Sequence, residues 1–205
     1  MRADRRKYDE CRDVYADKGL CVSSQGSARL KFGPTEVIAN INGPKELRYR
    51  EVDTGLTQVH VKTFPERHEL NDIITTAVSN SLDLSSYPDS YIDISITIVC
   101  DDGSLVSCAI NAAILALHDS SLKLKNRVCA SCFSFKGKEL YVDPSKHEEE
   151  VADGVVTFAY YNNLNNDNNG KIFSCYFEGL VDPSLLIVAA SKATYNHDIM
   201  AKYYD

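Results

Sequence analysis

Alternation of apolar and polar residues marks the clearest element of this chain. From Tyr91 to Val99, isoleucine occupies every second position and polar residues fill most of the positions between. Because successive side chains of a strand point to opposite faces, this pattern predicts a strand with one buried face. A shorter alternation at Val37, Ala39 and Ile41 predicts a second strand, which we expect the Gly43-Pro44 pair to end.

Two segments carry the spacing of helices. Apolar residues recur three and four positions apart from Glu66 to Leu84, which predicts an amphipathic helix. The residues from Leu105 to Leu117 are apolar nearly all round, which predicts a central buried helix after the turn Asp101-Asp102-Gly103-Ser104. We expect the Ser104 hydroxyl to cap this helix by accepting a hydrogen bond from a free backbone N–H group.

The second half of the chain contains short runs that favour strands. They span Val128–Phe135, Leu140–Val142, Val155–Tyr161 and Ile172–Phe177. The last two flank the Asn-rich segment 162–170, which predicts a hairpin loop. A final helix opens at Asp182-Pro183-Ser184 and is expected to continue to Met200. The order of strands and helices predicts one α+β domain over residues 1–205.

Composition places the chain among globular proteins. Of its 205 residues 44% are hydrophobic and 25% are charged, which excludes collagen-like, coiled-coil and wholly disordered classes. No apolar run is long enough to cross a membrane, and the first residues lack the apolar stretch of a signal peptide. The seven cysteines are odd in number and scattered, which fits free thiols in a reducing compartment. We therefore expect an intracellular protein.

The charge balance argues against bulk attraction to nucleic acid. There are 22 basic and 29 acidic residues, a net charge of −7, so any nucleic-acid contact has to be local. We interpret the basic clusters as solvated surface. They are Arg2, Arg5, Arg6 and Lys7; Lys45, Arg48 and Arg50; and Lys123, Lys125 and Arg127.

Metal and nucleophile motifs are weak. Cys129-Ala130-Ser131-Cys132 is the only C-x-x-C pattern, and no second pair at ligand spacing accompanies it. Thiols three apart on a strand point to opposite faces, so buried structural cysteines are favoured over a zinc or redox site. The histidines form no triad pattern, and we interpret them as surface or structural residues; those in predicted helices or loops are His118, His147 and His197.

Carboxylates gather after the predicted strand Leu140–Val142. Asp143 at the strand end, with a second carboxylate beside it, could hold Mg²⁺ or act as a general acid. The alternative is structural: Asp143-Pro144-Ser145 suits a turn and helix cap, and Glu148 to Glu150 suit a first helical turn. Taken alone, the residues favour the structural interpretation. Gly103-Ser104 likewise fits either a phosphate-binding helix start or an ordinary cap.

Ordered motifs along nearly the whole chain resemble those of the RNase PH family. In chain order they are Arg2-x-Asp4-x-Arg6, Asp9-Glu10-x-Arg12, Gly26-Ser27-Ala28, Gly33-x-Thr35-x-Val37, Gly43-Pro44-x-Glu46, Tyr87-Pro88-x-Ser90-x-Ile92, Asp102-Gly103-Ser104-Leu105, Cys108-x-Ile110-Asn111-Ala112-Ala113 and Val142-Asp143-Pro144. Within the family, the pattern is similar to that of ring subunits of the RNA exosome. The resemblance implies the RNase PH fold, an α+β fold of the ribosomal protein S5 domain 2-like type with mixed sheets packed with helices.

The resemblance also implies partners and a location. Members of this kind assemble with other RNase PH-like exosome subunits into a heteromeric six-membered ring around an RNA channel. Cap subunits of the S1/KH type and single-stranded RNA are further implied partners, and no membrane is implied. The ring serves 3′-to-5′ RNA processing and degradation, including that of ribosomal RNA. The implied location is the nucleus, with the nucleolus, and the cytoplasm.

The resemblance places the former active site at two motifs. Active members use inorganic phosphate to cleave RNA 3′ ends and carry a Gly-Thr-Arg phosphate loop, which here is Gly103-Ser104-Leu105. Their two aspartates lie six residues apart, and here those positions hold Asp143 and Glu149. We therefore expect a non-catalytic subunit with no cofactor. The alternative is an active phosphorolytic exoribonuclease using phosphate and Mg²⁺.

The resemblance further indicates an RNA contact. In related ring subunits the basic loop after Gly-Pro-x-Glu approaches the channel constriction, which here points to Arg48 and Arg50, with Tyr49 between them. Guanidinium groups can donate two hydrogen bonds to a phosphate, and a tyrosine ring can stack on a base. Arg67 is a second candidate for RNA contact. The alternative for all three arginines is solvated surface paired with nearby glutamates.

Overall fold

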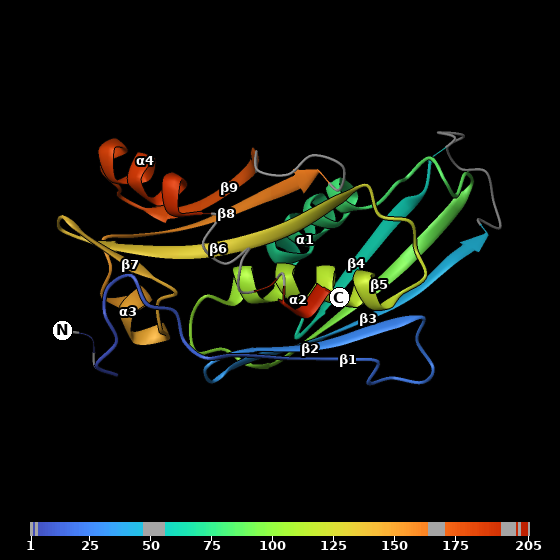
Figure 1. The fold of residues 1–205 in the computed structure, drawn as a ribbon, viewed down its shortest axis with the longest axis horizontal. Helices are drawn as coiled ribbons and strands as arrows, with labels where there is room; N and C mark the ends of the chain where they lie inside the picture. The colour runs from blue at the N-terminus through green and yellow to red at the C-terminus, as the bar shows by residue number, and fades with distance from the viewer. Residues whose placement is uncertain are drawn as a thin grey trace.

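Two β-sheets enclose a layer of helices. The computed structural model describes residues 2, 4–46, 56–163, 171–193, 200 and 202–204. The first sheet has the order β1-β2-β3-β5-β4 and the second the order β7-β6-β8-β9. Helices α1 and α2 lie between the sheets, and α4 lies on the outer face of the second sheet (Figure 1). This arrangement confirms the predicted α+β class with sheets packed against helices. The first sheet is mixed, because β4 pairs parallel with β5, whereas the strands of the second sheet all pair antiparallel, so the prediction of mixed sheets holds for the first sheet alone.

The structure contains every predicted strand and helix, and it adds three strands that were not predicted, Val14–Lys18, Gly26–Phe32 and Gln58–Phe64. The strands are β1 (Val14–Lys18), β2 (Gly26–Phe32), β3 (Thr35–Glu46), β4 (Gln58–Phe64), β5 (Ser90–Cys100), β6 (Asn126–Lys136), β7 (Glu139–Val142), β8 (Gly154–Asn163) and β9 (Lys171–Gly179). The helices are α1 (His68–Ser81), α2 (Leu105–Asp119), α3 (Lys146–Glu150) and α4 (Pro183–Lys192).

The isoleucine strand β5 is an interior strand of the first sheet. It pairs antiparallel with β3 and parallel with β4, and Ile92, Ile94 and Ile96 are buried against the helices, as predicted. The prediction that Gly43-Pro44 ends β3 was wrong, because the ladder resumes where Lys45 pairs with Tyr91. A register shift between Asn42 and Lys45 removes Gly43-Pro44 from the ladder, so the missing N–H of proline is not required there.

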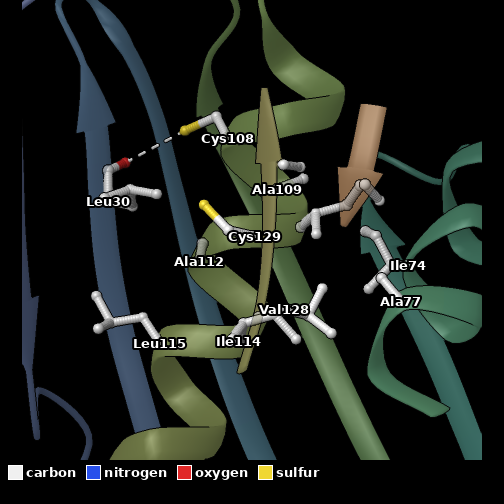
Figure 2. Packing of buried hydrophobic residues seen from close by; sticks show 14 of the residues in the cluster. Leu30, Ile74, Ala77, Cys108, Ala109, Ala112, Ile114, Leu115, Val128 and Cys129 are labelled. Carbon is white, nitrogen blue, oxygen red and sulfur yellow. Dashed lines mark hydrogen bonds between the residues drawn. The ribbon is translucent and has the colours of Figure 1, made fainter. Parts of the chain in front are cut away.

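Helix α2 forms the centre of the core. Its residues are almost all buried, as the all-round apolar pattern predicts. Figure 2 shows α2 between β2, β6 and α1. The residues labelled there are Leu30, Ile74, Ala77, Cys108, Ala109, Ala112, Ile114, Leu115, Val128 and Cys129. Small side chains such as Ala109 and Ala112 let the neighbouring elements approach closely, and each fully buried large side chain contributes about 1.5–3 kcal/mol.

The second sheet confirms the four predicted strands of this half. Strand β6 is nearly all buried because it also lies under the C-terminal residues: the Ser131 hydroxyl donates to the Ala193 carbonyl at 2.7 Å. Cys129 and Cys132 are both buried in this strand. Burial raises the pKa of Cys129 to about 11 and that of Cys132 to about 12, which keeps both as thiols at neutral pH.

The chain end departs from the predicted helix in length. Asp182 caps α4 by accepting a hydrogen bond from the Ser184 N–H at 2.9 Å, but the helix ends at Lys192 instead of continuing to Met200. Strands β8 and β9 pair antiparallel, as a hairpin requires. Of the loop predicted over 162–170, the first two residues belong to β8 instead, and 164–170 lie outside the described residues. Among the described residues, no helix combines the length and apolar character needed to cross a bilayer.

Candidate functional site

The predicted site residues lie where two loops meet. The first, called the α2 loop, is Asp101–Leu105, and the second, called the acidic turn, is Asp143–Glu149. The Lys146 N–H donates to the Asp102 carbonyl at 3.0 Å, which joins the two loops. The structure therefore brings together the Gly103-Ser104-Leu105 motif and the acidic segment, which lie about 40 positions apart in the chain.

Gly103 fits tightly against the acidic turn. Its φ is +84°, and a Cβ atom there would lie 2.4 Å from the Ser145 carbonyl carbon and 2.5 Å from the Pro144 oxygen. Only glycine tolerates both the conformation and the contact. The absence of a side chain at Gly103 therefore allows the α2 loop to pack directly on the acidic turn.

Ser104 does not cap α2 with its hydroxyl, so that prediction was wrong. The residue has φ +55°, in the left-handed region, and its hydroxyl donates to the Pro144 carbonyl at 3.0 Å. No backbone N–H group of α2 donates a hydrogen bond to its side chain. Its own backbone N–H instead donates to the Glu149 Oε1 atom at 2.7 Å. A carboxylate from the acidic turn thus occupies the positive end of the helix dipole.

Glu149 belongs to the short helix α3. That helix has its own capping box, in which the Ser145 hydroxyl accepts from the Glu148 N–H and the Glu148 carboxylate accepts from the Ser145 N–H. The structural interpretation of Ser145 and Glu148 is confirmed. Burial raises the pKa of Glu149, and the hydrogen bond from Ser104 only partly opposes that effect.

Asp143 is held in a buried ion pair with Arg12. The Arg12 Nη2 and Nε atoms lie 2.7 and 2.9 Å from its two oxygens, and the Arg12 backbone N–H donates at 2.8 Å. Burial by itself would raise the pKa of Asp143, but the hydrogen bonds and charge of Arg12 outweigh it and lower the pKa. The carboxylate of Asp143 is therefore already paired with Arg12 within the fold.

The N-terminal arginines support the same turn. Arg2 is buried, contrary to its prediction as solvated surface, because it pairs with Glu148 at 2.6 Å and donates to the Val142 and Asp143 carbonyls. Arg6 also donates to the Asp143 carbonyl, at 3.2 Å. Sequence reasoning missed this role of Arg2 and Arg12. The motifs Arg2-x-Asp4-x-Arg6 and Glu10-x-Arg12 were the available signal.

A cavity of about 390 Å³ opens beside the α2 loop, between α1, α2, α3, β8 and β9. Leu105, Leu70 and Ile73 contribute apolar lining. Its charged lining consists of two basic and five acidic side chains. These are Arg67, Lys146, Glu69, Asp101, Glu149, Glu150 and Glu178. Glu149 lines this cavity and Asp143 does not.

The basic groups of the cavity already have acidic partners. Arg67 Nη2 lies 3.3 Å from an Asp101 oxygen, and Lys146 Nζ lies 3.8 Å from Asp101 and 3.7 Å from Glu149. Arg67 is the N-cap residue of α1, and its half-exposed side chain reaches the same cavity as Leu105 and Glu149. Arg48 and Arg50 lie outside the described residues.

Comparisons with known proteins agree over most of the chain. Residues 10–123 match the model of the 3′ exoribonuclease family, domain 1, and residues 126–174 match domain 2 of that family. Exosome complex component Rrp41 of Pyrobaculum neutrophilum is 28% identical over 181 residues, 80% of this chain and 74% of the relative. Exosome complex component mtr3 of Schizosaccharomyces pombe is 26% identical over 212 residues, 93% of this chain and 80% of the relative.

Solved structures share the fold over the full length. Rice (Oryza sativa) Rrp46 superposes with a TM-score of 0.88 at 20% identity, covering 99% of this chain and 97% of that one. A chain of the Archaeoglobus fulgidus exosome with RNA bound to the active site gives a TM-score of 0.82 at 21% identity, covering 100% of this chain and 92% of that chain. These matches confirm the predicted fold.

Proposed function

Because this chain belongs to the RNase PH family of 3′ exoribonucleases, we propose that it is a non-catalytic ring subunit of an RNA exosome. Relatives named as exosome components, Rrp41 and mtr3, align over 80% and 93% of the chain and support the exosome assignment. The similarity in fold to rice Rrp46 agrees with it. The contribution of the subunit is then to ring structure and RNA contact.

The observation that carries the non-catalytic part is the charge of the cavity beside Leu105. The resemblance places the phosphate of active members at this loop. The cavity beside the loop is lined, however, by five carboxylates and by two basic side chains that already pair with acidic ones. An anion is repelled there. Leu105 also stands where active members carry arginine, and losing a donor that meets transition-state charge costs about 10²- to 10³-fold in rate.

Asp143 and Glu149, the carboxylates at the positions of the two active-site aspartates, give further support. A metal ion or an acid–base pair needs both groups to reach one reacting centre. Asp143 is bound by Arg12, and Glu149 accepts from the Ser104 N–H. The donor set therefore does not fit the Mg²⁺ ion that the alternative, active phosphorolysis, would use.

The partners in this proposal are RNase PH-like neighbours, S1/KH-type cap subunits and single-stranded RNA. Exposed apolar side chains directly after β9 and on α4 support protein neighbours, since Leu180 is 85% and Ile187 73% exposed. The resemblance alone supports RNA contact by Arg48, Arg50 and Arg67, and a nuclear and cytoplasmic location.

A phosphorolysis assay tests the catalytic part of the proposal. The purified chain, alone and in its co-purified ring, is incubated with labelled single-stranded RNA, Mg²⁺ and phosphate. We expect no release of nucleoside diphosphates from this subunit. Phosphate-dependent release that disappears in the Glu149→Gln variant would establish the active alternative, because that substitution changes the site by one charge while keeping its shape.

Affinity purification from the native cell tests the ring assignment. We expect the chain to co-purify with several different RNase PH-like subunits in stoichiometric amounts, which native mass spectrometry can count. A strictly monomeric protein that binds no other RNase PH-like subunit would contradict the assignment.

A further inference from the structure

The groups of the α2 loop that could bind an anion are engaged by the chain itself. The Ser104 N–H donates to Glu149, the Ser104 hydroxyl donates to Pro144, and Gly103 packs on the backbone of Pro144 and Ser145. We infer that Glu149 is a built-in anion that closes this loop to phosphate, so that removing its side chain opens a phosphate site. The inference rests on the proposed function, in which this loop is a former phosphate site.

The position of the carboxylate is that of a bound anion. Helix α2 has 15 residues, so its first turn carries the full positive end of the helix dipole. The Glu149 carboxylate binds there in two ways: Oε1 accepts from the Ser104 N–H at 2.7 Å, and Oε2 lies 3.7 Å from Lys146 Nζ. A backbone N–H at a helix start and an ammonium group are the donors that an inorganic phosphate would use.

The architecture of α3 does not require Glu149. The capping box that starts this helix uses Ser145 and Glu148. The carboxylate is instead turned to α2, and burial raises its pKa, so keeping it charged costs free energy that its hydrogen bond only partly offsets. The contact of the Glu149 carboxylate with the start of α2 is thus not explained by fold stability, which agrees with a role in blocking the α2 loop to phosphate.

Removing the side chain would create both space and donors. Glu149 lines the cavity of about 390 Å³, so truncation to alanine enlarges a space that already exceeds the roughly 30 Å³ share of one water many times. The Ser104 N–H then points into this space, and Lys146 loses one of its two acidic partners. One negative charge is also removed from the acidic lining of the cavity, which repels anions.

The test compares Glu149→Ala with wild type and with the matched control Glu150→Ala. Glu150 is the next residue of α3 and lines the same cavity, so its removal changes the cavity charge equally without freeing the Ser104 N–H. Inorganic phosphate is titrated at pH 8 into each full-length protein, and the Ser104 amide is followed by ¹H–¹⁵N NMR. A charge-assisted hydrogen bond of roughly 1.5–3 kcal/mol corresponds to about 10- to 150-fold in Kd. We expect Glu149→Ala to bind phosphate at least about 10-fold more tightly than either comparison protein.

Glu149→Gln keeps the experiment decisive if the alanine variant does not fold. Its neutral amide oxygen can still accept from the Ser104 N–H, so we expect a phosphate affinity between those of wild type and Glu149→Ala. The inference is overturned if the folded variants show no phosphate-dependent shift at Ser104, or if wild type binds phosphate equally well. Failure of the proposed function looks different: wild type would release nucleoside diphosphates from RNA.

Discussion

Replacing Asp143 with alanine should destabilise the fold instead of removing an activity. The carboxylate accepts three hydrogen bonds from Arg12, two from the guanidinium and one from the backbone, at 2.7–2.9 Å. Both side chains are almost fully buried, with 6% of the Arg12 side chain and 4% of the Asp143 side chain exposed. The substitution therefore leaves a buried guanidinium without its main partner.

The expected magnitude follows from that burial. Removing one partner of a buried ion pair typically costs about 3–5 kcal/mol, because the remaining charge stays desolvated. Arg12 keeps hydrogen bonds to the Asp102 and Gly103 carbonyls, so the lower half of that range applies. For a chain of this size 1 kcal/mol corresponds to about 2–4 °C in Tm, so Tm should fall by roughly 6–16 °C.

Urea unfolding at pH 7 measures the change, with Asp102→Ala as the matched control. Asp102 also faces Arg12, at 3.6 Å, but its side chain is 37% exposed, and such pairs contribute about 0–1 kcal/mol. The Asp143 effect should also depend on pH. Since the folded pKa of Asp143 is lowered, its contribution is present above the unfolded pKa of about 3.9 and is lost as pH falls through the folded value.

A double-mutant cycle with Arg12→Ala completes the experiment. The two substitutions should be far from additive, with a coupling energy within the range of about 0.5–3 kcal/mol seen for contacting groups. A loss below about 1 kcal/mol for Asp143→Ala, or full additivity with Arg12→Ala, would refute the reasoning and return Asp143 to the list of catalytic candidates.

Three further predictions address the loops, the thiols and pH. Gly103→Ala should cost at least about 1 kcal/mol more in urea unfolding than Gly137→Ala, because both glycines have positive φ but a Cβ atom at Gly137 would meet nothing within 4 Å; equal losses would contradict the close packing described above. Cys21, whose pKa is lowered by hydrogen bonding from nearby serine hydroxyls, should react with a disulfide reagent before buried Cys129, whose pKa is raised to about 11, and the reverse order would be inconsistent with the fold. The pKa of Glu149 is raised in the fold, so its favourable contribution to stability is present below the unfolded pKa and is lost as pH rises through the folded value. Wild type should therefore lose stability relative to Glu149→Gln as pH rises from about 4. A difference in unfolding free energy that does not change with pH would show that burial does not disfavour the charge of Glu149.

Local patterns were sufficient for most elements of the fold, but not for β1, β2 and β4. The alternation around Ile94 and the all-round apolar character near Ala112 record burial directly, so β5 and α2 could be located from the sequence. The continuation of β3 past Gly43-Pro44 could not, because a bulge depends on the pairing strand. The same holds for the end of α4 at Lys192, where no local signal in the sequence marks the end.

The candidate site was predictable in its location but not in its connections. The resemblance pointed to Ser104, Asp143 and Glu149, and the structure places all three within the two adjoining loops. The partners of these residues were not predictable, since Arg2 lies 146 positions from Glu148 and a charge run near a chain end resembles solvated surface. Contacts over such separations depend on the assembled tertiary structure.

The arginines of the N-terminal segment also constrain the order of events during synthesis. The carboxylate that pairs with Arg12 is synthesised 131 residues after it, and the carboxylate that pairs with Arg2 is synthesised 146 residues after it. At translation rates of 5–20 residues per second this delay is roughly 7–30 s. For that time the first guanidinium groups leave the ribosome without their carboxylates. The acidic turn is therefore completed late in biosynthesis, when the earliest part of the polypeptide closes on a much later one.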